Sequence, residues 1–235
     1  MTSTKIYHKF VPYYDRFTRK RFYLNYCNFI VRLIKQARIE NPALLDLACG
    51  TGRLLSVLRR HPLFKLDKLE GLDCSHQMIK EAKRANCGLV FYHQRLEKFH
   101  TGKKYDVILC TFDSVNYILN KKELRATFKN VRKALLPKGI FVFDFNTVYK
   151  KVDGKIVRGP VTMESKIEED VWHINILIKK DREVYIERHV ERLYSAEEVL
   201  KLLKLAGFKK IDFYNKNFRK LSRPSIQERL VVVAN

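Results

Sequence analysis

The stretch that most constrains this chain runs from Ala43 to Leu55 and reads A-L-L-D-L-A-C-G-T-G-R-L-L. Its first half is an apolar run interrupted by one acid, Asp46, which is typical of a buried strand. Gly50 and Gly52 then end the strand, and leucines at helical spacing follow. This order of strand, glycine turn and helix predicts an α/β nucleotide-type site, because a turn without side chains lets a ligand reach the backbone and the first amides of the helix.

Two common ligands of such turns do not fit the residues that follow. A dinucleotide loop has a third glycine that packs helix against strand, but Leu55 occupies that position. A P-loop needs Gly-Lys-Ser/Thr, which Gly52-Arg53-Leu54 does not supply. The next predicted strand, Leu66–Cys74, carries Asp73 about 20 positions after Gly52, the offset expected of an acid that binds ribose hydroxyls. We therefore expect a nucleoside ligand that lacks a pyrophosphate.

The motif L-D-L-A-C-G-T-G followed by G-L-D-C-S-H-Q-M-I-K-E-A resembles the class I S-adenosylmethionine-dependent methyltransferases, and the likeness runs from about Tyr14 to the C-terminus. It implies a Rossmann-like α/β sheet of seven strands, mostly parallel, with an antiparallel C-terminal edge pair at Lys210–Tyr214 and Arg229–Ala234. It also implies S-adenosyl-L-methionine as cofactor, S-adenosyl-L-homocysteine as product and no metal. The F-D-S-V-N-Y segment from Phe112 resembles a subset that methylates small molecules, so the expected acceptor is an amine, carboxylate or hydroxyl of a small molecule.

The rest of the chain fits one methyltransferase domain over residues 1–235. Aromatic residues between positions 1 and 40 predict an N-terminal helical cap. Alternating patterns in residues 150–192 predict an antiparallel β insertion, which serves as a lid or a dimer surface. The other predicted strands are Leu89–Tyr92, Tyr105–Cys110 and Ile140–Phe145, and helices are predicted after Ser75, over Leu124–Leu136, and after Ser195, where Glu198 completes a capping box and Gly207 ends the helix.

The resemblance implies which residues hold the cofactor. A tyrosine in a leading helix of the family reaches the methionine carboxylate or lines the substrate mouth, and Tyr14 matches it. Met78 would pack against adenine, with ordinary core packing as the alternative. The family often follows its third strand with Gly-Asp, but this chain has His93-Gln94, so Gln94 would accept the bond from the adenine amino group. The expected cofactor-binding residues are Tyr14, Asp46, Ala48, Gly50, Gly52, Asp73, Cys74, Met78, Gln94, Arg95, Leu96, Cys110 and Thr111.

The acceptor side is expected after the fourth strand, since the carboxyl ends of strands face the ligand crevice in a doubly wound sheet. Phe112 and Asn116 are the predicted substrate contacts. Asp113 either approaches the methyl group or caps the following helix, and both readings stay open at this point. Candidates for a catalytic role are Tyr14, Asp113 and His189, although most histidines on strands are surface residues.

The chain carries 47 Lys and Arg against 25 Asp and Glu, a formal charge of +22. This charge makes an RNA (tRNA) methyltransferase the alternative function, unless it reflects a generally basic proteome. The chain shows no membrane-length apolar run, no secretory apolar segment and no C-x-x-C pair. We therefore expect a cytoplasmic protein with reduced thiols and no membrane partner, present as a monomer or a homodimer.

Overall fold

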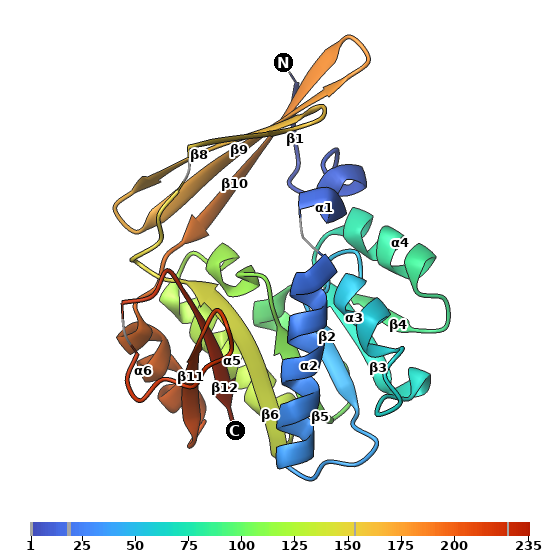
Figure 1. Ribbon diagram of the computed structural model, residues 1–235, viewed down its shortest axis with the longest axis vertical. Helices are drawn as coiled ribbons and strands as arrows, with labels where there is room; N and C mark the ends of the chain where they lie inside the picture. The colour runs from blue at the N-terminus through green and yellow to red at the C-terminus, as the bar shows by residue number, and fades with distance from the viewer. Residues whose placement is uncertain (1, 18–19, 153, 225) are drawn as a thin grey trace.

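The computed structural model describes residues 2–17, 20–152, 154–224 and 226–235, and it contains two sheets (Figure 1). The larger sheet has seven strands in the order β11-β12-β6-β5-β2-β3-β4. These strands are β2 (Leu44–Leu47), β3 (Leu69–Asp73), β4 (Val90–His93), β5 (Tyr105–Cys110), β6 (Leu135–Asn146), β11 (Ile211–Asn215) and β12 (Arg229–Ala234). Strands β2 to β6 run parallel, whereas β12 pairs antiparallel with β6 and β11 antiparallel with β12. The predicted fold class is thereby confirmed.

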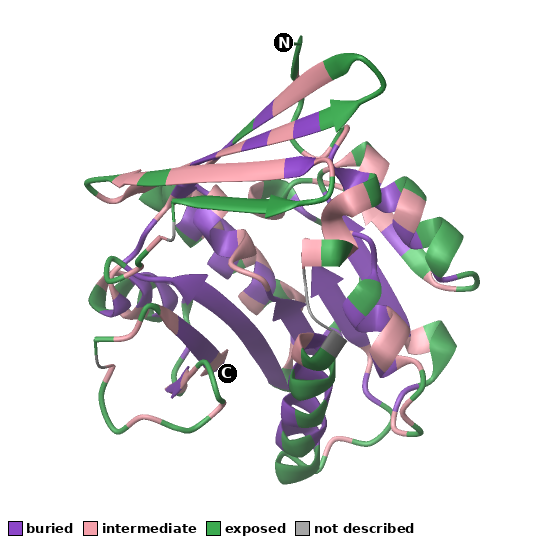
Figure 2. Cartoon of the chain, turned by 45° about the horizontal axis from the view of Figure 1, so that its top comes forward, coloured by how far each residue is buried: buried purple, intermediate pink, exposed green. Residues whose placement is uncertain are grey.

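Helices cover both faces of this sheet. α2 (Lys20–Gln36), α3 (Arg53–Leu58) and α4 (His76–Ala85) contribute to one apolar cluster, and α5 (Lys121–Ala134) and α6 (Ala196–Ala206) to the other. Figure 2 shows the central strands buried between these layers. The Ser75 cap of α4, the Ser195–Glu198 capping box of α6 and the left-handed Gly207 at its end are as predicted.

The smaller sheet has five strands in the order β1-β10-β9-β8-β7. Its strands are β1 (Thr2–Thr4), β7 (Lys155–Arg158), β8 (Val161–Glu168), β9 (Val171–Lys180) and β10 (Glu183–Arg192). The meander β8-β9-β10 matches the prediction, but β7 was not predicted, nor was the parallel pairing of β1 with β10. The sheet stands above the end of the large sheet where α1 (Val11–Phe17) lies (Figure 1). Phe10 and the aromatic side chains of α1 pack against this small sheet. We call the N-terminal segment (residues 2–17) and the small sheet (residues 154–192) together the roof.

Two element boundaries differ from the sequence prediction. The helix predicted to end at Leu136 ends at Ala134, and β6 begins at Leu135 rather than Ile140. Strand β6 continues through Pro137-Lys138-Gly139 because Leu135 pairs with Tyr105, with a register shift before Val107. Gly139 fits there because a Cβ would lie 3.0 Å from the Tyr105 carbonyl oxygen. Of the helices in the described ranges, none has the length and apolar character that crossing a membrane requires.

Candidate cofactor site

The loop between β2 and α3 is built from left-handed residues. Gly50 and Gly52 have φ of 54° and 73°, a conformation that side chains rarely adopt. A Cβ on Gly52 would lie 2.7 Å from Nδ2 of Asn86, so this position has no room for one. A Cβ on Gly50 would lie 3.9 Å from both the Met78 sulfur and the Tyr14 ring. The two glycines therefore differ in role: Gly52 lets the loop pack on α4, and Gly50 lies on the open side, between Tyr14 and Met78.

Asp73 lies at the end of β3, directly beside this loop. Its Oδ2 accepts a hydrogen bond of 2.9 Å from the Gly50 amide, and its Oδ1 accepts one of 2.7 Å from the Ser75 amide. Burial raises the pKa of Asp73, and the Ser75 and Gly50 amides partly oppose that shift. The parallel pairing of β2 with β3 brings the loop and the acid together. The spacing of about 20 residues thus corresponds to direct contact between the acid and the glycine bend.

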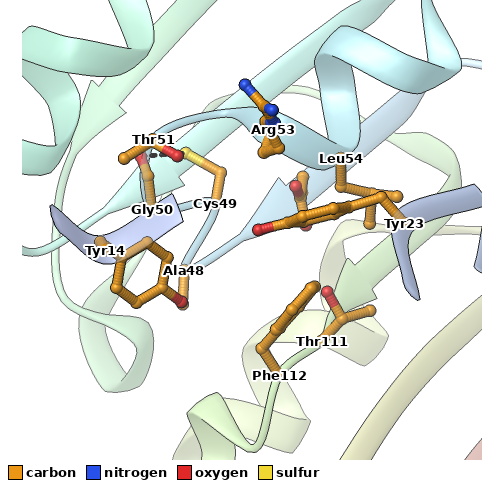
Figure 3. A pocket seen from close by; sticks show the side chains of 11 residues that line it. Tyr14, Tyr23, Ala48, Cys49, Gly50, Thr51, Arg53, Leu54, Thr111 and Phe112 are labelled. Atoms are coloured by element: carbon orange, nitrogen blue, oxygen red, sulfur yellow. Dashed lines mark hydrogen bonds between the residues drawn. The ribbon is translucent and has the colours of Figure 1, made fainter. Parts of the chain in front are cut away.

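A pocket opens between this loop, α1, α2 and the end of β5. Figure 3 shows the rings of Tyr23 and Phe112 on one side of it and Gly50 and Thr51 on the other. Six predicted site residues line the pocket together: Tyr14, Asp46, Ala48, Gly50, Thr111 and Phe112. The remaining lining residues are Tyr23, Cys49, Thr51, Arg53 and Leu54.

Asp46 is a buried carboxyl group that lines this pocket. It is 2% exposed, and burial, together with the nearby charge of Asp73, raises its pKa to about 8. A cation placed against it would stabilise the ionised form and lower that pKa. The position therefore suits a positively charged ligand group such as an ammonium.

The N-terminal segment closes over the loop through specific contacts. Thr51 Oγ1 donates a 2.9 Å hydrogen bond to Asp15, and Arg53 lies 3.8 Å from the same carboxylate. The neighbouring Tyr14 ring faces Gly50, and burial raises the pKa of its hydroxyl well above the ordinary value. The two neighbouring residues thus have different roles: Tyr14 lines the pocket, and Asp15 bonds to the loop.

Eight predicted cofactor residues are not among those that line the described pocket, namely Gly52, Asp73, Cys74, Met78, Gln94, Arg95, Leu96 and Cys110. The side-chain amide of Gln94 is bonded to the backbone of His100. Its nitrogen donates to the His100 carbonyl at 3.1 Å, and its oxygen accepts from the His100 amide at 2.8 Å. Arg95 pairs with Glu97, Leu96 begins the short 3-10 turn Leu96–Lys98, and Cys74 is exposed. Met78, in contrast, is buried with its sulfur facing Gly50.

The predicted residues at and after the end of β5 fall into two groups. Cys110, predicted to contact the cofactor, and Asn116, predicted to contact substrate, are fully buried, and the Asn116 amide bonds to the backbone of Asn146 and Arg192, joining the 3-10 turn Ser114–Tyr117 to β6 and β10. This environment makes Asn116 a cross-link of the structure rather than an open contact for substrate. Phe112 lines the pocket and stacks among Phe22, Tyr23 and Tyr26.

Asp113 belongs to a polar cluster next to the pocket. It is left-handed, with φ of 52°, and it occupies the N-cap position of the 3-10 turn Ser114–Tyr117, although its side chain makes no capping hydrogen bond. Its carboxylate instead accepts a 2.5 Å bond from Asn146 Nδ2 and lies 3.4 Å from Arg229. Glu191 is buried 3.4 Å from the same Asn146 nitrogen, and burial and the Asp113 charge raise its pKa.

Asp144 supports the cluster from β6. Its carboxylate accepts bonds from the amides of Phe112 and Asp113, from the Tyr26 hydroxyl and from Arg229. These bonds fix the left-handed turn at residues 112–113, which points Phe112 toward the pocket. His189 lies on β10, two residues before Glu191, and is buried against the rings of Tyr7 and Tyr117.

Sequence reasoning missed Tyr23, Thr51 and Arg53 as pocket residues. Thr51 and Arg53 lie next to the glycines of the motif, so their position beside Gly50 and Gly52 could have identified them as pocket residues. Tyr23 was assigned to the packing face of a helix, and its second role could not be separated from packing by periodicity alone.

Comparisons with known proteins agree with this geometry. A family model described as a methyltransferase domain matches residues 44–139. A dTDP-3-amino-3,6-dideoxy-alpha-D-glucopyranose N,N-dimethyltransferase of Streptomyces fradiae is 30% identical over 115 residues, which is 49% of this chain and 44% of that protein. The putative methyltransferase YqeM of Bacillus subtilis is 26% identical and covers 86% of both chains. The chain spans 44% and 59% of the first two curated relatives it matches.

Among solved structures, an S-adenosylmethionine-dependent methyltransferase from Clostridium acetobutylicum superposes with a TM-score of 0.81 at 27% identity. The superposition covers 97% of this chain and 98% of that protein, so it includes the roof as well as the large sheet. The glycine loop with its acid, the strand order 11-12-6-5-2-3-4 and these likenesses match the class I S-adenosylmethionine-dependent methyltransferases, and a methyltransferase domain is shown over residues 44–139 of this chain.

Proposed function

We propose that this protein transfers a methyl group from S-adenosyl-L-methionine to the amine of a small molecule. The observation that carries the proposal is the convergence of the glycine loop, the buried Asp46 and the Tyr14 cap on one pocket. The N,N-dimethyltransferase of S. fradiae, similar over half of this chain, supports an amino-sugar type of acceptor.

The residues present fit the cofactor. Asp46 would hold the ammonium of the cofactor's methionine part, and Asp73 would hold the ribose hydroxyls. Gly50, which has no side chain, would leave room for the methionine part beside the loop. Met78 would cover the adenine side, where its sulfur faces the open Cα of Gly50. When bound, the cofactor supplies a methyl group on a positively charged sulfur. Gln94, Arg95 and Leu96 are not part of this assignment, because the side-chain amide of Gln94 is already hydrogen-bonded to the backbone of His100.

The acceptor would approach from the side of Asp113. Asp113 and Glu191 are two carboxyls held close together by Asn146, with Arg229 beside Asp113 as a counter-charge. Carboxyl groups in such a position suit an acceptor that arrives as a cation, which favours an amine over a carboxylate. Tyr14 and Phe112 would shape the opening through which the acceptor nitrogen meets the methyl group. The protein would contribute mainly alignment and the exclusion of water.

We also propose that the N-terminal segment before α2 (residues 2–17) and the small sheet (residues 154–192) act together as a lid. The contacts of Asp15 with Thr51 and of Phe10 with the small sheet support this role, because they join both segments to the glycine loop. Opening of the roof would then precede exchange of cofactor and product.

The experiment that tests the function has two steps. Isothermal titration with S-adenosyl-L-homocysteine should give saturable heat, which D46A and D73A variants should abolish or weaken strongly. Turnover is then measured as formation of S-adenosyl-L-homocysteine. The acceptors supplied are dTDP-3-amino-3,6-dideoxy-alpha-D-glucopyranose and simple amines, carboxylates and alcohols. The absence of binding heat with the unmodified protein would contradict the proposal.

The charge of +22 keeps one competing function to be tested in the same assays. Binding of tRNA by a protein that neutralises several phosphates weakens steeply with salt, because counterions are released on binding. We expect no tRNA methylation and no saturable tRNA binding at physiological salt. Methyl incorporation into tRNA, rather than into the amine panel, would replace the small-molecule proposal.

A further inference from the structure

A chain of polar contacts runs through the roof and begins at Tyr7, whose ring packs against the pocket residue Tyr14. The Tyr7 and Tyr117 hydroxyls are 2.6 Å apart, and the Tyr117 hydroxyl lies 3.0 Å from Nδ1 of His189. Nε2 of the same imidazole lies 3.4 Å from Oε2 of Glu187. The four side chains come from the N-terminal segment, the turn after β5 and strand β10, so only the folded protein brings them together.

The buried end of this chain is built to remain charged. Glu187 is fully buried and accepts hydrogen bonds of 2.6 to 3.0 Å from the backbone amides of residues 7–10. Burial alone would raise the pKa of Glu187, but His189 and the amides of Phe10 and Lys9 outweigh it and lower the pKa. The Glu187 carboxylate lies 3.4 Å from Nε2 of His189, an ion-pair distance without hydrogen-bond geometry, and its charge favours the tautomer with the ring proton on Nε2 and a lone pair on Nδ1.

This tautomer sets the direction of the other bonds. With a lone pair on Nδ1, the Tyr117 hydroxyl donates to His189, and the Tyr7 hydroxyl donates to Tyr117. Burial raises the pKa of both tyrosines, so both hydroxyls keep their protons at neutral pH. The Tyr7 oxygen then has acceptor capacity left over at the outer end of the chain.

The outer end lies beside the proposed site. The Tyr7 ring packs edge-on against Tyr14, with 5.7 Å between ring centroids, and Tyr14 lines the pocket. The charges of Glu191 and Asp113 both act on Tyr7 and on Tyr117. His189 itself is 2% exposed and is contacted by the rings of Tyr7 and Tyr117.

An amine that binds as an ammonium has no lone pair with which to attack. We propose that Tyr7, Tyr117 and His189 form a proton relay that deprotonates an ammonium acceptor, with Glu187 as the positioning residue that fixes the His189 tautomer. This inference rests on the proposed function.

In the relay, the acceptor N–H proton moves to the Tyr7 oxygen, the Tyr7 proton to Tyr117 and the Tyr117 proton to Nδ1 of His189. The imidazolium formed is stabilised by the Glu187 carboxylate. The freed nitrogen pair forms the N–CH3 bond while the S–CH3 electron pair stays on sulfur. Product release returns the His189 proton to solvent.

A pH-resolved comparison of variants separates a relay from a merely structural network. Y117F and H189Q are compared with the unmodified protein and with Y13F, which removes a hydroxyl from the same aromatic cluster outside the relay. The probe is dTDP-3-amino-3,6-dideoxy-alpha-D-glucopyranose, assayed at pH 7 and at a pH above the pKa of its amine.

At pH 7 we expect both relay variants to lose roughly 10²-fold in kcat, the range of general acid–base catalysis, while Y13F stays within about twofold. At high pH the amine arrives neutral, so the relay variants should return to within about threefold of the unmodified protein. An equal loss at both pH values, or no loss at pH 7, would overturn the relay.

A second measurement needs no acceptor. Long-range proton–nitrogen NMR correlations of the histidine rings, with His189 assigned from H189Q, report which nitrogen carries the proton. We expect the neutral His189 ring to carry its proton on Nε2, and a neutral ring protonated on Nδ1 would overturn the relay. Failure of the proposed function is seen separately, as the absence of S-adenosyl-L-homocysteine binding by the unmodified protein.

Discussion

The Asp73 carboxylate accepts a hydrogen bond from the Gly50 amide across 2.9 Å, so the acid of β3 and the bend after β2 form one unit. The contact orients Asp73 toward the loop while its second oxygen is held by the Ser75 amide. Loss of the carboxylate therefore removes the proposed ligand for ribose and also leaves two amides without their partner.

From this relationship we expect D73A to weaken S-adenosyl-L-homocysteine binding by about 10²-fold or more and D73N by roughly tenfold, since two lost charge-assisted hydrogen bonds are worth several kcal/mol. Isothermal titration measures both. The control is D67A, which changes an exposed acid in the turn that leads into β3. Equal binding by D73A and D67A would contradict the role of Asp73.

Asp46 predicts an unusual dependence of stability on pH. Its pKa in the folded protein is about 8, against an ordinary value of 3.8, so between these values the folded state binds more protons than the unfolded state. Stability contributed at this site therefore falls as the pH rises from about 4 to about 8.

We expect D46N to be the more heat-stable protein, with a difference in melting temperature that grows from pH 5 to pH 8 and is level above that. Thermal melts of both proteins across this range measure it, because their other titrating groups are shared. D67N should show no such trend, and a constant offset between D46N and the unmodified protein would speak against the raised pKa.

The central part of the site could be predicted because its signals are local in the sequence. Strand, glycine turn and helix occupy Ala43–Leu55, and Asp73 ends the strand that pairs with it. The residue patterns predicted the individual strands, whereas the seven-stranded sheet and its antiparallel edge at β11 and β12 came from the family resemblance.

The rest could not be predicted because it depends on contacts between distant segments. Tyr7 meets Tyr117 across 110 positions and Glu187 across 180, and β1 has only three residues and no apolar pattern. The cofactor assignment of Gln94 came from the resemblance alone, and a local bond to His100 occupies that side chain.

Gly52 should be more sensitive to substitution than other left-handed glycines. In G52A the new Cβ would lie 2.7 Å from Nδ2 of Asn86, which also bonds the carbonyls of Gly52 and Ala82. G88A is the matched control, because Gly88 has φ of 88° with no atom within 4 Å of an added Cβ.

We expect G88A to lose about 1 to 2 kcal/mol from the left-handed conformation alone, and G52A to lose about 1 to 3 kcal/mol more through overpacking. Denaturant unfolding measures both free energies. Similar losses in the two variants would mean that Asn86 moves aside without cost and that the loop does not depend on this contact.

Glu187 should control the order of the N-terminal segment, because one buried carboxylate holds four successive amides. In E187Q a neutral amide with a single acceptor oxygen replaces the carboxylate, so these hydrogen bonds weaken by about 1 to 3 kcal/mol in total. We expect amide exchange at residues 7–10 to accelerate by tenfold or more and, since Tyr14 and Asp15 follow directly, S-adenosyl-L-homocysteine binding to weaken.

Hydrogen exchange followed by mass spectrometry compares E187Q with E183Q, which changes an exposed glutamate on the same strand. E183Q should leave the exchange of residues 7–10 unchanged. If E187Q also left it unchanged, the apolar cluster around Phe10 would hold the N-terminal segment instead, and that segment would not depend on the Glu187 carboxylate of β10 for its position.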